Sequence, residues 1–130
     1  MTGPKWVTIA IVTAIHDEAL YEFGGLTGVR ERGLLESALD RPHSLFAYEP
    51  DSSIFALAAS LCIGLAKNHP FNDGNKRTAL LATRAFLYLN GQELEPSQES
   101  EVITMVSVAD GSLSEAELAD WLQSNSNKRI

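Results

Sequence analysis

Apolar positions along the chain recur mostly every three or four residues, which is the spacing of helices that bury one face. Glycine, proline and capping residues divide this pattern into pieces. Few runs alternate with a period of two, and no hairpin dipeptide lies between two such runs, so the evidence for strands is thin. The pattern predicts helices over residues 8–23, 34–40, 54–67, 75–90, 97–109 and 114–124.

Capping chemistry supports several of these boundaries. Thr8 and Ser97 can accept hydrogen bonds from the first turns of the helices that follow them, and Asp51, Ser52 or Ser53 can do so before residue 54. Ser114 and Glu117 have the spacing of a capping box, in which each side chain bonds the backbone N–H of the other residue. The helix ends are marked by glycines, notably Gly24-Gly25 and Gly91.

Proline sets one boundary differently. The residue before a proline is disfavoured in the helical region, so the short helix from Leu34 to about Asp40 is expected to end before Pro42. The segment Arg41–Pro50 is then expected to be irregular and to hold a short strand or flap.

Two helices dominate the apolar content, over 54–67 and 75–90. The second is apolar nearly all round after Arg77, which is typical of a buried central helix. In the helix over 97–109, one predicted face carries Val102, Met105, Val106 and Ala109. With no repeat and no linker, the chain is predicted to be a single all-α domain over 1–130. We expect a bundle of about six helices around a buried central helix, with 125–130 as a frayed tail.

Charge and cysteine content narrow the function classes. Ten Lys and Arg against 17 Asp and Glu give a net charge of -7, which disfavours broad nucleic-acid binding and docking on an anionic membrane. The longest uncharged run, Ser52 to Ala66, is shorter than the roughly 20 residues of a membrane-spanning helix. A single cysteine, Cys62, excludes an internal disulfide and favours a cytoplasmic location.

The candidate chemistry lies between the two most apolar helices. There the loop 68–74 leads into a helix start, whose unpaired N–H groups and partial positive charge favour an anion. Gly74 permits an unusual backbone angle, and Lys76 with Arg77 places two positive charges in a first turn that normally favours acids. An external anion, such as a phosphate, would supply the missing negative charge.

Two further residues extend this hypothesis to phosphoryl transfer. Asp73 could hold a divalent cation that bridges phosphates, and His69 could accept a proton from an attacking hydroxyl. Phe71 would point into the core and fix the loop. A plainer interpretation also stands: histidine before proline, Asp-Gly and Lys-Arg are common in ordinary loops, turns and solvated faces.

The stretch His69-Pro70-Phe71-Asn72-Asp73-Gly74-Asn75-Lys76-Arg77 resembles the active-site motif of the Fic/Doc (Fido) superfamily. Fic proteins carry His-x-Phe-x-(Asp/Glu)-Gly-Asn-Gly-Arg-x-x-Arg. Here Lys76 stands in place of a glycine and Leu80 in place of the second arginine, and both departures are typical of the Doc (death-on-curing) branch. The resemblance covers about residues 8–122 and implies the Fic/Doc fold.

This resemblance implies roles for the motif residues. His69 would be the general base, and Asp73 would bind Mg²⁺. Lys76 and Arg77 would hold the phosphates of ATP or another nucleoside triphosphate. Nucleotide contacts would also come from Asn72, Gly74 and Asn75. Lys67, just before the motif, is either a charge that complements the end of its own helix, which is the favoured interpretation, or an extra phosphate contact.

The Doc branch is known as a kinase toxin of type II toxin–antitoxin systems that phosphorylates a threonine of elongation factor Tu and inhibits translation. The resemblance therefore implies a Ser/Thr kinase and a separate Phd-like antitoxin whose tail folds as a helix on the first helices and on Arg41–Pro50. Neither nucleic acid nor membrane is an expected direct partner. Two alternatives stay open: an AMP-transferring Fic enzyme, and an inactive module that only binds antitoxin.

Other polar residues carry weaker signals. His16-Asp17 is similar to part of a metal phosphohydrolase motif, but no histidine precedes His16 to complete the set, so His16 is expected to cap or pack in the first helix. His43 is expected in a loop. Arg30 and Arg32 are expected to be solvated.

Overall fold

The computed structural model describes residues 3–129. These residues form six α-helices and two short strands. No helix in this part of the chain combines the length and apolar character needed to cross a lipid bilayer. The elements are α1 (Ile9–Phe23), α2 (Arg32–Tyr48), α3 (Ile54–Asn68), α4 (Asn75–Leu89), β1 (Gln92–Leu94), α5 (Gln98–Asp110), α6 (Glu115–Ser124) and β2 (Ser126–Lys128).

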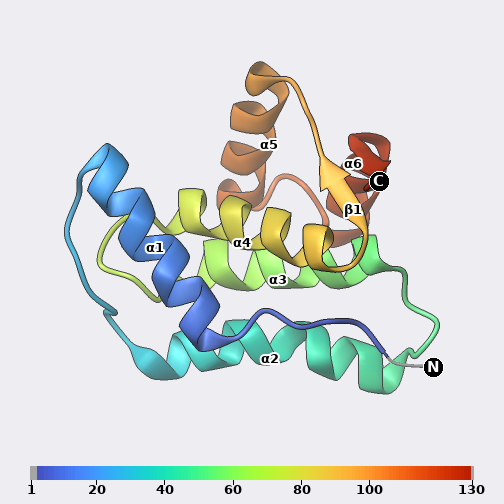
Figure 1. Ribbon diagram of the computed structural model, residues 1–130, viewed down its shortest axis with the longest axis horizontal. Helices are drawn as coiled ribbons and strands as arrows, with labels where there is room; N and C mark the ends of the chain where they lie inside the picture. The colour runs from blue at the N-terminus through green and yellow to red at the C-terminus, as the bar shows by residue number, and fades with distance from the viewer. Residues whose placement is uncertain (1–2, 130) are drawn as a thin grey trace.

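The helices α2, α3 and α4 run across the molecule one above another, with α3 in the middle (Figure 1). Successive helices in this stack reverse direction, so the end of α3 and the start of α4 lie at the same end of the bundle. α1 crosses that end of the stack. α5 and α6 cover the side of α3 and α4 that faces away from α2. The prediction of an all-α bundle of six helices is confirmed.

Side-chain caps begin four of the helices. Thr8, Ser53, Ser97 and Ser114 each accept a hydrogen bond from a backbone N–H in the first turn of the following helix, which confirms these predicted boundaries. Ser114 and Glu117 form the full capping box. Only α2 and α4, among the helices described, start without a side-chain cap.

The most buried helix is α3 rather than α4. Both have 15 residues, but nine are buried in α3 and seven in α4. α3 packs against α2, α4, α5 and α6, whereas α4 leaves Tyr88 and Leu89 partly exposed. Gly64 allows α2 to approach closely, because a Cβ there would lie 3.1 Å from the Cα of Ala38. The identity of the central helix was thus wrongly predicted from the apolar count alone.

The predicted end of a helix before Pro42 is also wrong. α2 continues through Pro42 to Tyr48, so Arg41–Pro50 is mostly helical and contains neither a strand nor a flap. Pro42 is buried with Leu35, Ala38 and Leu39 on the face that packs against α3. Packing of this continuous apolar face outweighs the hydrogen bond that proline cannot make.

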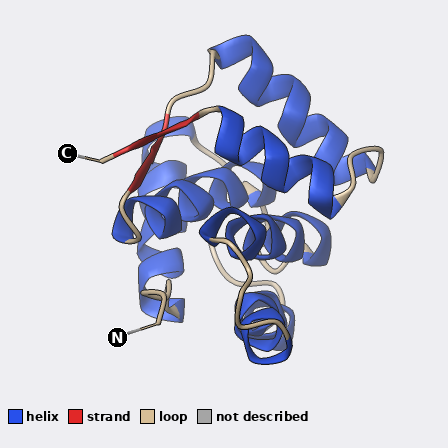
Figure 2. Ribbon diagram, turned by 90° about the vertical axis from the view of Figure 1, so that its right-hand side faces the viewer, coloured by secondary structure: helices blue, strands red, loops and turns tan. Residues whose placement is uncertain are grey.

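Two short strands join the later part of the chain to α4. β1 and β2 pair antiparallel, with Glu93 opposite Asn127, and the two strands cross at one edge of the helices (Figure 2). Residues 126–128 are therefore paired, contrary to the expected frayed tail over 125–130, of which Ile130 lies outside the described residues. Three-residue strands are too short to produce a readable period of two.

The buried face of α5 also differs from expectation. Thr104, Met105 and Val108 are buried, while Val102 and Val106 are 59% and 48% exposed. Apolar residues lie on two sides of this helix, so periodicity alone did not settle which side packs against α3 and α4. Tertiary packing selects the side that carries Met105.

Candidate active site

The loop 69–74 joins α3 to α4 at the end of the bundle that α1 crosses (Figure 1). A second loop, over 24–31, lies alongside and bonds to it through the backbone. Val29 forms an isolated antiparallel bridge with Phe71, and the N–H of Arg30 donates to the Pro70 carbonyl at 2.7 Å. The N–H of Asn72 donates to the Gly28 carbonyl at 3.1 Å. The motif loop is thus held along its length by a segment some forty residues earlier.

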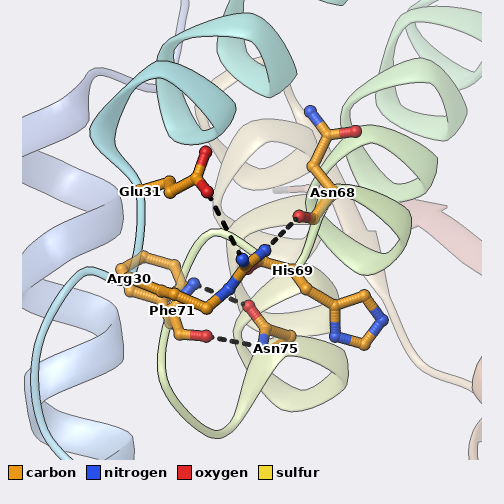
Figure 3. A network of polar contacts seen from close by, with 6 residues as sticks. All are labelled: Arg30, Glu31, Asn68, His69, Phe71 and Asn75. Atoms are coloured by element: carbon orange, nitrogen blue, oxygen red, sulfur yellow. Dashed lines mark hydrogen bonds and ion pairs between the residues drawn. The ribbon is translucent and has the colours of Figure 1, made fainter.

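His69 ends α3 in the left-handed conformation, with φ 50° and ψ 55°. It is the one non-glycine residue with positive φ among residues 3–129, and its side chain is exposed. Its carbonyl accepts a hydrogen bond from Arg30 Nε at 2.9 Å, and the Asn68 carbonyl accepts one from Arg30 Nη2 at 3.2 Å (Figure 3). The predicted general base therefore stands free at the mouth of the loop on a tightly held backbone.

Asp73 lies at the other end of the loop, next to the start of α4. Its two carboxylate oxygens accept from the N–H groups of Gly74 at 2.9 Å and Leu26 at 3.2 Å, and the residue is exposed. Gly25 fits closely behind it at φ 126°, since a Cβ there would lie 2.8 Å from Asp73 Oδ2. The orientation of this carboxylate is therefore fixed by the neighbouring backbone, while the residue stays exposed to solvent.

The two asparagines of the motif brace the loop. The Asn75 side chain accepts from the Phe71 N–H and donates to the Phe71 carbonyl, both at 3.0 Å (Figure 3). The Asn72 side-chain amide donates to the Thr27 carbonyl at 2.8 Å. Both amides thus already have partners within the protein, and their contacts to a nucleotide stay predictions.

The start of α4 is open. Gly74 occupies the N-cap position at φ 72° without a side-chain hydrogen bond, and the first turn carries no acid. Lys76 and Arg77 are exposed there, and within residues 3–129 neither forms an ion pair with a carboxylate. The Arg77 guanidinium lies 3.7 Å from the ring centroid of Phe23 in α1, a cation–π contact.

Cavities lie on both sides of this helix start. One, of about 240 Å³, lies between α1 and α4 and is lined by His16, Phe23, Asp73 and Arg77, among others. The other, of about 200 Å³, lies between α4 and α5 and is lined by Lys76, Arg77 and Leu80, with Glu101 and Met105 opposite. Arg77 borders both cavities, so the N-terminus of α4 is open to a ligand from either side.

His16 and Phe71 connect the loop to the interior. The two rings stack with centroids 3.9 Å apart, and His16 Nε2 lies 2.9 Å from the carbonyl oxygen of Asp73. Both side chains are almost fully buried. The predicted packing role of His16 and the predicted burial of Phe71 are confirmed.

The remaining candidates fall outside this constellation. Lys67 lies against the end of α5, where a Cβ at Gly111 would be 3.2 Å from Lys67 Nζ. The pKa of Asp110 is lowered there, mainly by hydrogen bonds from Ser112 and further by Lys67. Lys67 also lies in the last turn of its own helix, α3, as the helix-end role requires. A phosphate contact of Lys67 stays a prediction. His43 lies in α2 rather than in a loop, stacked on Trp6.

Arg30 is exposed, as expected, with its side chain 44% accessible, but its contacts were not predicted. Its guanidinium binds the last carbonyls of α3, and its partners are backbone atoms 38 and 39 residues away. No sequence motif marks such a contact. The only available signal was the position of Arg30 in a glycine-rich loop within the region of resemblance.

The chain is similar to one known protein family and to two known proteins of related function by name. A family model described as the Fic/DOC family matches residues 6–87. The chain is 36% identical over 110 residues to the protein kinase doc of Escherichia phage P1, covering 85% of this chain and 86% of that protein. It is 42% identical over 73 residues to the toxin Doc of Mycolicibacterium smegmatis, covering 55% and 56% of the respective chains.

Proposed function

The chain belongs to the Fic/DOC family, and from that premise we propose that it is a Doc-like toxin with kinase activity. It transfers the γ-phosphoryl group of a nucleoside triphosphate to a Ser or Thr hydroxyl of a translation factor. Elongation factor Tu is the expected target, and the action takes place in the cytoplasm. The open, doubly basic start of α4, with Asp73 and His69 on the adjoining loop, carries this proposal.

The residues present suit a magnesium nucleotide. Uncapped N–H groups, Gly74 and two free cations at a helix start match the charge and size of phosphate oxygens. Mg²⁺ is typically held by one or two carboxylates together with substrate phosphates, and Asp73 is an exposed carboxylate at this position. Asp73 would hold Mg²⁺, while Lys76 and Arg77 would hold the phosphates. When bound, Mg²⁺ neutralises the charge that develops on the transferred group.

The chemical step requires one proton acceptor. The target hydroxyl oxygen forms a new bond to the γ-phosphorus, and the bond from that phosphorus to the bridging oxygen breaks. The bridging oxygen keeps the electron pair and leaves with the nucleoside diphosphate. The hydroxyl proton passes to a ring nitrogen of His69, which faces solvent at the loop mouth.

Two residues favour phosphate over AMP transfer. Lys76 stands where Fic enzymes carry glycine, and it fills the room through which an α-phosphate would approach the backbone. Leu80 stands where those enzymes carry a second arginine, and it is nearly buried at the edge of the cavity between α4 and α5. Charge at Lys76 and the missing clamp at Leu80 support a different nucleotide orientation.

A separate antitoxin is the proposed regulatory partner. The surfaces expected to receive its helix include α1 with the loop that follows and the end of α2. These carry large exposed apolar side chains, with Tyr21 94%, Leu26 68% and Tyr48 87% exposed. The net charge of -7 suits a basic segment on that partner.

The test is expression of the chain in bacteria without an antitoxin, followed by intact-mass analysis of elongation factor Tu. We expect growth arrest and the gain of one phosphate on the factor. His69→Ala should abolish both effects. His43→Ala, which removes an exposed histidine from α2, is the matched control and should keep both.

Other outcomes are equally informative. The gain of one AMP would keep the fold and the site but overturn the γ-phosphoryl assignment. Unimpaired growth with no mass change on the factor would overturn the proposed target. An unchanged phosphate gain in His69→Ala would remove His69 from the role of general base.

A further inference from the structure

Arg30 makes a set of contacts that the proposed chemistry does not by itself require. Its Nε donates to the carbonyl of His69 at 2.9 Å, and its Nη2 donates to the carbonyl of Asn68 at 3.2 Å (Figure 3). We propose that Arg30 is a positioning residue that fixes the backbone of His69 and thereby aims the imidazole at the target hydroxyl. This inference rests on the proposed function, in which His69 is the general base.

The geometry of the two carbonyls supports this role. The carbonyl of Asn68 belongs to the peptide plane before the Cα of His69, and the carbonyl of His69 belongs to the plane after it. The rotations of these two planes are the φ and ψ of His69. One rigid guanidinium that binds both oxygens therefore fixes both angles, and with them the direction in which the side chain leaves the backbone.

His69 needs such a restraint because its conformation is unfavourable. The left-handed region at φ 50° places the Cβ too close to the following carbonyl oxygen, so a residue other than glycine rarely stays there unaided. Such strain persists only where the surroundings over-determine it. The same two carbonyls end α3 without intrahelical partners, and a cation at that end also complements the helix dipole.

Arg30 is itself held in place from both sides. Its backbone N–H donates to the Pro70 carbonyl at 2.7 Å, and its Nη1 lies 3.6 Å from Glu31 Oε1. The Glu31 N–H donates to the same Pro70 carbonyl at 3.2 Å. All three nitrogens of the guanidinium thus have partners. A planar fork suits this arrangement, whereas the single ammonium of lysine would not match both carbonyls in the same way.

The site has two halves, and the contacts of Arg30 lie in the half that contains His69. Arg30 touches the side of the loop that carries His69, while Asp73 is held by Leu26 and Gly74 on the other side. Loss of the Arg30 side chain should therefore misplace the base and leave the nucleotide and Mg²⁺ contacts intact. A residue that merely kept the loop folded would affect both halves together.

The experiment compares Arg30→Ala and Arg30→Lys with Arg32→Ala. Arg32 is a matched control because its side chain is 70% exposed and its ion-pair partner within residues 3–129 is Glu36, at 4.0 Å. In Arg30→Ala we expect kcat for phosphoryl transfer to fall roughly 10- to 100-fold, as for a reacting group displaced by about 1 Å. The KM values for nucleotide and Mg²⁺ should stay within about twofold of wild type, on the same reasoning. Arg30→Lys should lie between Arg30→Ala and wild type, and Arg32→Ala should match wild type.

Two kinetic results would overturn the proposal. One is an unchanged kcat in Arg30→Ala. The other is a rise in both KM values in step with the fall in kcat, since that would indicate a melted loop rather than a misdirected base.

A second measurement does not depend on activity. The chain has three histidines, so the NMR signals of His69 can be assigned by their loss in His69→Ala. Its Cα and Cβ chemical shifts report the left-handed backbone, and they should change in Arg30→Ala and not in Arg32→Ala. If the wild-type protein transfers no group, the proposed function fails. These shifts then decide the inference, and unchanged shifts in Arg30→Ala would overturn it.

Discussion

The starts of α4 and α6 treat their unpaired backbone N–H groups in opposite ways. At α6, Ser114 Oγ accepts from the Glu117 N–H at 3.1 Å, and the Glu117 carboxylate accepts from the Ser114 N–H at 2.9 Å. Acids in the first turn complement the helix dipole. At α4, Gly74 provides no cap, and Lys76 and Arg77 add positive charge to a positive helix end.

The two helix starts differ in where their first N–H groups find hydrogen-bond partners. The first four N–H groups of any helix lack intrahelical partners, and α6 satisfies part of that need from its own residues. α4 leaves its first N–H groups without such partners and adds two positive charges beside them, which is unfavourable in the free protein. An anion from outside would complete the site. A helix start that departs from the usual rules in this manner is expected at functional sites.

The sharpest test is to give α4 the charge pattern of α6. Lys76→Glu should lower the rate of phosphoryl transfer by about 10²- to 10³-fold, because a phosphate ligand is replaced by a repelling charge. The acid should also stabilise the helix start by about 0.3–1 kcal/mol. Transfer kinetics and thermal denaturation measure the two effects. Lys128→Glu, the same reversal in β2, should leave transfer unchanged, and normal transfer by Lys76→Glu would remove the phosphate site from α4.

The second test disturbs the carboxylate beside the open helix start. In Gly25→Ala the new Cβ would lie 2.8 Å from Asp73 Oδ2 and 3.0 Å from Leu20 Cδ2, so the carboxylate must move. Transfer should fall roughly 10- to 100-fold, with a higher requirement for Mg²⁺. Gly24→Ala is the matched control, since Gly24 also has positive φ but a Cβ there meets nothing within 4 Å. Equal loss in both variants would indicate backbone strain alone.

The third test removes the cap that α6 provides for itself. Ser114→Ala should lower the free energy of unfolding by about 1 kcal/mol, because an N–H group loses its partner. Phosphoryl transfer should not change, since α6 lies on the far side of the bundle from the motif loop. Chemical denaturation measures the first effect, with Ser44→Ala as a control at an exposed serine inside α2. A loss of transfer without a loss of stability would contradict the assigned structural role.

The smallest effect is the pH dependence of the same cap. Hydrogen bonds from the backbone and side chain of Ser114 lower the pKa of Glu117 from its ordinary value of 4.5. The carboxylate therefore adds stability that is fully present above pH 4.5 and is lost as the pH falls through the lowered pKa. Wild type should exceed Glu117→Gln in denaturation midpoint near neutral pH, and the difference should vanish in acid. A difference that grows in acid would have the wrong sign for this mechanism.

Local chemistry accounts for what the sequence predicted well. Thr8, Ser97 and the Ser114–Glu117 box act within three residues of themselves, so their helix boundaries could be read directly. The motif from His69 to Arg77 is also local, which is why the loop and the open start of α4 were predicted in their true positions.

Tertiary packing accounts for the features that were predicted poorly from the sequence. The helix through Pro42 is stabilised by contacts with α3, and those contacts are not encoded near Pro42 itself. The buried side of α5 is likewise selected by its neighbours. Arg30 was missed because its partners are carbonyls of the backbone, which any residue possesses, at positions 38 and 39 residues further on.

The turn that ends α4 has a further consequence for protein engineering. The backbone of Lys5 exchanges two hydrogen bonds with the Asn90 side chain, at 2.8 and 2.9 Å, and the Arg129 N–H donates to the Gly91 carbonyl at 2.8 Å. Residues 5 and 129 are therefore both bonded to this turn, at the opposite end of α4 from the motif loop. A linker between them is expected to permit circular permutation, with new ends opened between α2 and α3 and the motif-loop end of the bundle left uncut.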